Sequence, residues 1–121
     1  MKKENVVQTK SYEFALLCIK LYQKLTKEQQ EYVLSKQILK SGTSIGANIE
    51  EAIGGQSTRD FLSKMAISYK ETRETHYWLR LLRDSNYITD QESMYLINKC
   101  EELLKIIGSI QKTTKLKIRN S

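Results

Sequence analysis

Basic and aromatic residues alternate along one segment of the chain, between residues 64 and 83. The basic residues are Lys64, Lys70, Arg73, Arg80 and Arg83, and the aromatic residues are Tyr69, Tyr77 and Trp78. Arginine binds phosphate through paired hydrogen bonds, and aromatic rings stack on unpaired bases, so this combination favours RNA or other nucleic acid. The alternative is that the basic residues form a solvated face and the aromatic residues belong to the core.

A second unusual segment, residues 40–61, contains four of the five glycines among small polar residues. It has neither the GxxxxGK[ST] pattern of a phosphate-binding loop nor the GxGxxG pattern of a dinucleotide fold. Gly42 and Gly46 are four residues apart and share one helical face. With Ala47 they are expected to allow close contact with another helix or subunit, where Ser44 and Asn48 would satisfy polar groups. A local bend at Gly42 is the alternative.

The other reactive residue types form no catalytic or metal-binding pattern. His76 is the only histidine and has no Glu three residues before it, so the Glu-x-x-His pairs of a di-iron bundle are absent. A nucleophilic triad would depend on the same histidine. Cys18 and Cys100 have no CxxC partner and are expected to be reduced and buried. The sequence therefore predicts no catalytic residue, no metal, no cofactor and no enzyme.

Charge and hydropathy limit the class of protein. The chain has 121 residues and a net charge of +6, with a sequence pI of about 9.3. This balance suits nucleic acid, an acidic protein or an anionic surface, and it also occurs for solubility alone. No apolar run reaches the roughly twenty residues of a membrane span, and the N-terminal region lacks the apolar segment of a secretion signal. We expect one cytoplasmic domain over residues 1–121, with no membrane partner.

The elements that must position these residues are helices. There is no proline, and apolar residues recur at helical spacing in four segments, at about residues 10–25, 28–53, 57–85 and 89–112. Because the connections are only a few residues long, neighbouring helices must be antiparallel. The predicted fold is all-α, an up-down-up-down antiparallel four-helix bundle. A basic C-terminal tail is expected to be frayed beyond it.

Capping signals predict where three of the helices begin. Each is a Ser or Thr followed three residues later by Gln, Asp or Glu: Thr26 with Gln29, Ser57 with Asp60, and Thr89 with Glu92. Gly54 and Gly55 predict the end of the second helix. The apolar phase continues through Gly42 and Gly46 without a slip, which predicts one long helix across them.

Three motifs in this chain resemble those of the bacterial four-helix-bundle family first found as proteins encoded by intervening sequences in 23S ribosomal RNA genes, the S23 family. They lie at Ser44–Glu51 (Ser-Ile-x-Ala-Asn-Ile-Glu-Glu), Ser57–Phe61 (Ser-x-x-Asp-Phe) and Glu74–Leu79 (Glu-Thr-x-Tyr-Trp-Leu). The resemblance is close over residues 34–88. It implies the same bundle and a ring-shaped homopentamer. A related protein, the accessory protein of diversity-generating retroelements, binds nucleic acid and a reverse transcriptase.

Two functions are compatible with these observations. The first is a non-enzymatic homo-oligomer, a pentamer by resemblance, that binds RNA or DNA through its basic residues. The second is a scaffold that recognises an acidic protein partner, with nucleic acid incidental. A ligand-binding bundle with a pocket between its helices is a third, weaker interpretation.

Overall fold

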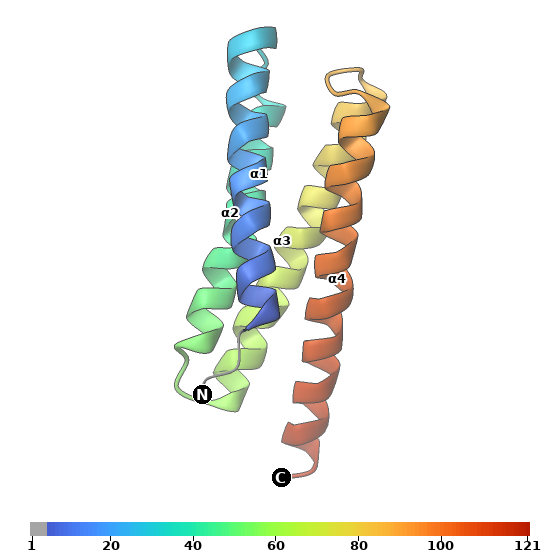
Figure 1. Ribbon diagram of the computed structural model, residues 1–121. Helices are drawn as coiled ribbons and strands as arrows, with labels where there is room; N and C mark the ends of the chain where they lie inside the picture. The colour runs from blue at the N-terminus through green and yellow to red at the C-terminus, as the bar shows by residue number, and fades with distance from the viewer. Residues whose placement is uncertain (1–4) are drawn as a thin grey trace.

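The computed structural model describes residues 5–121, so the first four residues of the predicted 1–121 domain lie outside the described part. Four helices follow one another through short turns: α1 (Val6–Gln29), α2 (Leu34–Ile53), α3 (Thr58–Asp84) and α4 (Asp90–Arg119). They run alternately up and down (Figure 1). The predicted all-α, up-down-up-down four-helix bundle is confirmed.

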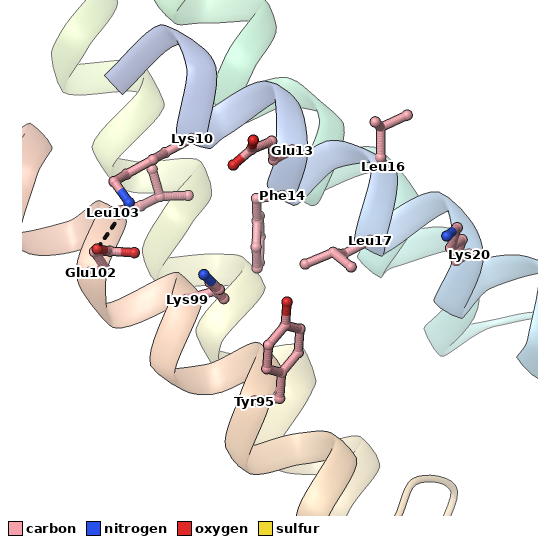
Figure 2. Close-up of a pocket in the computed structure, with 10 residues that line it drawn as sticks. All are labelled: Lys10, Glu13, Phe14, Leu16, Leu17, Lys20, Tyr95, Lys99, Glu102 and Leu103. Atoms are coloured by element: carbon pink, nitrogen blue, oxygen red, sulfur yellow. Dashed lines mark ion pairs between the residues drawn. The ribbon is translucent and has the colours of Figure 1, made fainter. Parts of the chain in front are cut away.

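Each helix packs on two neighbours, and within residues 5–121 the backbones of the diagonal pairs of helices do not come close to one another. The tightest contacts join α2 to α3, and α1 and α4 touch least. Across the α1–α4 boundary, Lys10 Nζ lies 3.1 Å from Glu102 Oε2 (Figure 2). Every helix contributes apolar residues to one core, in which the most fully buried include Phe14, Leu25, Ile38, Ile45, Ile49, Met65, Leu79, Leu82, Leu103 and Ile107. Burying each of these side chains stabilises the fold by about 1.5–3 kcal/mol.

Small hydroxyl residues complete the core between α2 and α3. Ser68 Oγ donates to the carbonyl oxygen of Ile45 at 2.9 Å. Thr75 Oγ1 donates to Ser41 Oγ at 2.8 Å, and Ser41 Oγ donates to the carbonyl oxygen of Gln37 at 2.9 Å. No buried side-chain nitrogen or oxygen in the described part of the chain lacks a hydrogen-bond partner. These short side chains allow α2 and α3 to approach closely without leaving polar groups unsatisfied.

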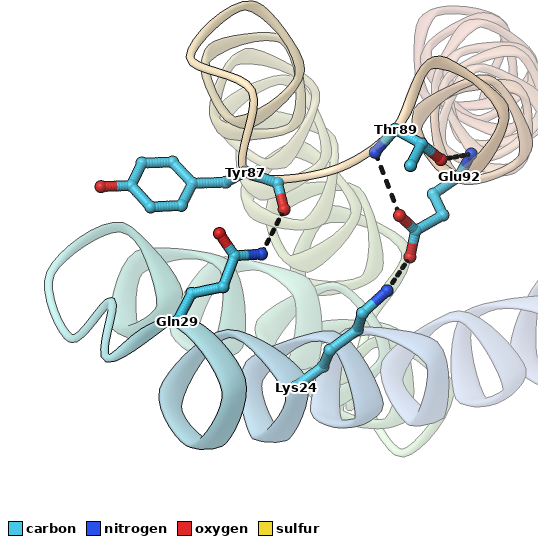
Figure 3. A network of polar contacts seen from close by, with 5 residues as sticks. All are labelled: Lys24, Gln29, Tyr87, Thr89 and Glu92. Carbon is cyan, nitrogen blue, oxygen red and sulfur yellow. Dashed lines mark hydrogen bonds and ion pairs between the residues drawn. The ribbon is translucent and has the colours of Figure 1, made fainter.

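Two predicted helix starts are confirmed in atomic detail. Ser57 Oγ accepts from the N–H of Asp60 at 3.0 Å, and α3 begins at the next residue, Thr58. At α4, Thr89 Oγ1 accepts from the N–H of Glu92 at 3.1 Å (Figure 3). Glu92 Oε1 accepts from the N–H of Thr89 at 3.0 Å, which completes a capping box. Gly54 and Gly55 follow the end of α2 as predicted.

The predicted start of the second helix near residue 28 is wrong, and so is the proposed cap at Thr26. Thr26 lies inside α1, where its hydroxyl donates to the carbonyl oxygen of Tyr22 at 3.0 Å. A threonine that bonds back in this way fits a helix interior, so its presence did not mark a boundary. The chain turns instead at Gln30, whose φ of 51° is left-handed.

A buried carboxylate begins α2. Glu31 is 9% exposed, and its two carboxylate oxygens accept from the N–H groups of Val33, Leu34 and Ser35 at 3.2, 3.0 and 2.7 Å. These are donors that the first turn of a helix leaves free. A negative charge at a helix N-terminus is also electrostatically favourable. Because capping scans look for Ser, Thr, Asp or Asn, this signal was missed.

The outer helices are longer than predicted. α1 begins at Val6 instead of about residue 10, since Asn5 Oδ1 accepts from the N–H of Gln8 at 3.0 Å. α4 continues to Arg119 instead of ending near residue 112, so the predicted basic tail is part of the helix. Thr114 is buried within this extension. Lys117 and Arg119 occupy the last turn, where cations favour the helix dipole.

Candidate nucleic-acid interface

The outward face of α3 carries a line of basic residues. Arg59, Lys70, Arg73, Tyr77 and Arg80 are all exposed, and their successive spacings of eleven, three, four and three residues keep them on one side of the helix. We call these five residues the α3 stripe. The opposite side of α3 is buried in the core. At 1.5 Å per residue, the ten residues from Lys70 to Arg80 span about 15 Å.

The cations of the α3 stripe have no carboxylate partner among residues 5–121. The ion pairs of this part of the chain involve other basic residues: Lys10, Lys24, Lys64, His76 and Arg83. An exposed cation that no acid neutralises contributes its full charge to the local field. The α3 stripe is therefore a positively charged surface whose cations form no ion pair within the described residues, although Asp84 lies near Arg80 and Glu71 lies near Lys70.

Tyr77 supplies an aromatic ring within the α3 stripe. It is 47% exposed, and the Arg80 guanidinium carbon lies 5.7 Å from its ring centroid. The ring of Tyr77 also contacts the ring of Trp78 edge to face, with 5.2 Å between the two ring centroids. Trp78 and Tyr69 are only partly exposed and pack against the core. The core interpretation therefore holds for these two residues, and Tyr77 alone of the three predicted aromatic residues stands on the stripe.

Two of the predicted basic residues are neutralised by neighbours. Lys64 Nζ lies 3.3 Å from Glu51 Oε1 on α2, and Arg83 Nε donates to Asp84 Oδ1 at 2.8 Å. The hydrogen bond from Arg83 lowers the pKa of the Asp84 carboxyl, and the charges of Arg83 and Arg80 lower it further. The structure thus brings together Lys70, Arg73 and Arg80, and separates Lys64 and Arg83 from them.

Arg59 is a member of the α3 stripe that sequence reasoning missed. It precedes Lys70 by eleven residues and Arg73 by fourteen. These spacings are close to three and four helical turns, so the three side chains leave the helix in directions that differ by only a few tens of degrees. Its spacing was therefore available in the sequence.

The glycines of α2 lie against α1. A Cβ atom at Gly42 would stand 2.4 Å from Cys18 Sγ and 2.8 Å from Cys18 Cβ, and one at Gly46 would stand 3.3 Å from Ser11 Oγ. Helix α2 is uninterrupted through both positions, as the continuous apolar phase predicts. Close approach at these glycines is between two helices of one chain.

The remaining small residues of α2 do not share that contact. Ser44 Oγ donates to the carbonyl oxygen of Lys40 at 2.7 Å, and Asn48 Nδ2 donates to that of Ser44 at 2.8 Å. Both bonds lie within α2, so these side chains do not satisfy polar groups of α1. Ala47 is exposed. The five residues predicted as one packing surface therefore divide between two sides of the helix.

The remaining reactive side chains are accounted for by structural contacts. His76 Nε2 lies 3.0 Å from Glu101 Oε2, linking α3 to α4. Cys18 and Cys100 are free and buried, and burial raises the pKa of each thiol to about 12. Within residues 5–121, no group of three or more His, Cys, Asp or Glu residues is placed to hold a metal ion. Nor is any helix of this part long and apolar enough to cross a membrane.

The fold and the α3 stripe together define a basic four-helix-bundle protein with a cationic face on α3. The chain belongs to the 23S rRNA-intervening sequence protein family, whose pattern it matches over residues 3–109. It is similar in structure to a protein of unknown function from the S23 ribosomal protein family of Bacteroides thetaiotaomicron. The two are 50% identical with a TM-score of 0.88, and the match covers 88% of this chain and 99% of the other. No curated protein matches the chain.

Proposed function

We propose that this protein is a non-enzymatic homo-oligomer that binds RNA or other nucleic acid through the α3 stripe. The observation that carries the proposal is that four exposed cations on one helical face have no carboxylate partner among the described residues. Phosphates are the ligand that such a line of charge favours, because binding releases condensed counterions. The arginines offer paired hydrogen bonds, and Tyr77 offers a ring on which an unpaired base stacks.

The proposed assembly is a homopentameric ring in the cytoplasm, because the family resemblance of the sequence implies such a ring. Five chains at +6 each would carry +30, which would attract a polyanion over several ångströms. Cyclic symmetry would also present the α3 stripe five times, so one structured RNA would meet several stripes at once. Sedimentation of the native protein measures the number of chains, and a monomer would refute the ring.

The deciding experiment is binding of the purified protein to labelled structured RNA over a salt series. With four phosphate contacts, each stripe that the RNA engages through unpaired nucleotides should contribute about −2.8 to the slope of log K against log salt. Arg73→Ala/Arg80→Ala should reduce this slope by about half, since two of the four contacts are removed. Lys27→Ala/Lys36→Ala is the matched control, because it removes the same charge from exposed positions outside the stripe.

Three outcomes of this experiment would overturn the proposal. Absence of RNA binding at low salt would refute it directly. Equal loss in the two double variants would mean that net charge, and not the α3 stripe, is responsible. Binding that is insensitive to salt would exclude phosphate contacts. In the first case, a scaffold that recognises an acidic protein partner becomes the better explanation of the basic face.

A further inference from the structure

Two adjoining cavities lie between α1 and α4, on a different side of the bundle from the α3 stripe. The larger has a volume of about 380 Å³ and the smaller about 210 Å³, and both are lined by Leu17, Lys20 and Tyr95. The two cavities meet at these three shared residues, and we call them together the α1–α4 slot. It exists because α1 and α4 are the least tightly packed neighbours in the bundle.

An ion pair closes each end of the α1–α4 slot. Lys10 meets Glu102 at one end, and Lys24 meets Glu92 at the other (Figures 2 and 3). Lys10 and Lys24 are fourteen residues apart on α1, so the slot is about 21 Å long. A packed helix is about 10–12 Å wide and would have to separate α1 from α4 and break both pairs to enter. The slot therefore fits a narrow, elongated ligand better than a protein segment.

The interior of the slot is mostly apolar. Phe14 and Leu17 line it from α1, and Leu96 and Leu103 line it from α4. Figure 2 shows the Tyr95 ring extending from α4 toward Leu17 and Phe14, so it forms a wall of both cavities. Phe14, Leu96 and Leu103 are already buried and form the floor of the slot, so a flexible hydrocarbon chain would remove mainly the surfaces of Leu17 and the Tyr95 ring from water.

The charges of the slot favour one negative group. Lys20 on α1 and Lys99 on α4 line the larger cavity and have no ion-pair partner among the described residues. Lys99 Nζ lies instead over the Tyr95 ring, 5.6 Å from its centroid. Glu13 also lines this cavity and opposes an anion, whereas Lys10 and Glu102 neutralise each other. One positive charge is therefore left in excess.

We propose that the α1–α4 slot binds an amphipathic carboxylate, an unbranched alkyl chain with one anionic head. The head lies against Lys99 and Lys20, and the chain follows the apolar side chains of α1 and α4. This inference is independent of the nucleic-acid proposal, because no residue of the α3 stripe lines the slot.

The test is a calorimetric titration of the full chain with decanoate, below its micellar concentration, beside the neutral alcohol decanol. Decanoate should bind saturably, and from octanoate to dodecanoate each methylene should tighten binding about fourfold until the slot is full. The Lys20→Ala/Lys99→Ala variant should bind decanoate about tenfold more weakly and should bind decanol with unchanged affinity. The Glu13→Gln variant should bind decanoate more tightly, because it removes a negative charge that opposes the carboxylate. Lys112→Ala, an exposed residue of α4 outside the slot, should have no effect.

Filling the slot provides a second test. Leu17→Trp places a larger side chain where both cavities meet and should abolish decanoate binding, with circular dichroism confirming that the bundle is intact. Equal affinity for decanoate and decanol, or no saturable binding of either, would overturn the proposal. So would a Leu17→Trp protein that still binds decanoate but sediments with fewer chains, since the slot would then be an interface between copies.

Discussion

Replacement of Gly42 by alanine tests how closely α1 and α2 approach. The new Cβ would lie 2.4 Å from Cys18 Sγ and 2.8 Å from Cys18 Cβ. The thiol can rotate, but the Cβ cannot move without its backbone. Ordinary contact begins near 3.4 Å, so α1 must shift by several tenths of an ångström. Overpacking of this kind costs about 1–3 kcal/mol. Alanine recovers about 1 kcal/mol of helix propensity.

Because two atoms are overlapped, we expect a cost near the upper end and a net loss of about 2 kcal/mol for Gly42→Ala. The matched control is Gly108→Ala in α4, whose Cβ would meet only Tyr69 Cε1, at an ordinary 3.5 Å. That substitution should stabilise the protein by up to about 1 kcal/mol, since helix propensity is its main effect. The same chemical change should therefore have opposite signs at the two glycines.

The assay is urea unfolding followed by circular dichroism, with the m-value checked for each variant. A double variant, Cys18→Gly/Gly42→Ala, should be more stable than the sum of the single changes predicts, because both overlapping atoms are gone. A Gly42→Ala protein as stable as Gly108→Ala would show that the helices are not tightly packed at this point, and the reasoning would fail.

Two further predictions concern ionisable groups. The hydrogen bond from Lys24 lowers the pKa of the Glu92 carboxyl from 4.5, with help from the Thr89 N–H (Figure 3). The stabilisation from the ionised Glu92 carboxylate is therefore complete above pH 4.5 and disappears as the pH falls through the lower pKa of the folded state. The Glu92→Gln variant should therefore lose less of its free energy of unfolding on acidification than the Glu28→Gln variant. Glu28 is an exposed control residue without an ion pair, and equal pH profiles of stability for the two variants would contradict this prediction. Burial raises the pKa of Cys18 and Cys100 to about 12, so neither thiol should react with Ellman's reagent at pH 8 until urea unfolds the bundle. Rapid reaction in native buffer would show that the thiols are accessible.

The candidate interface was only partly predictable from sequence. Lys70, Arg73 and Arg80 were identified correctly as neighbours, because helical spacing fixes which residues share a face. Spacing could not reveal that Glu51 on α2 approaches Lys64, since that ion pair joins two helices. The difference between Trp78 and Tyr77 also depended on which side of α3 the core covers.

The helix boundaries show where local rules compete. Ser57 and Thr89 cap their helices as predicted, because each side chain bonds a backbone N–H only three residues away. Thr26 has the same local pattern but bonds backward within α1, and the buried Glu31 caps α2 in its place. Glu31 can do so because the left-handed residue Gln30 turns the chain at that point.

The sequence by itself determined the number, order and direction of the helices, since apolar periodicity, short connections and the absence of proline are all local properties. It also determined the cationic face of α3. Only the tertiary structure decided that Gly42 meets Cys18, that Lys64 is neutralised by Glu51, and that α1 and α4 leave a slot between them. Each of these depends on the distance between two helices, which side-chain packing across the whole core sets and which no pattern within one helix contains.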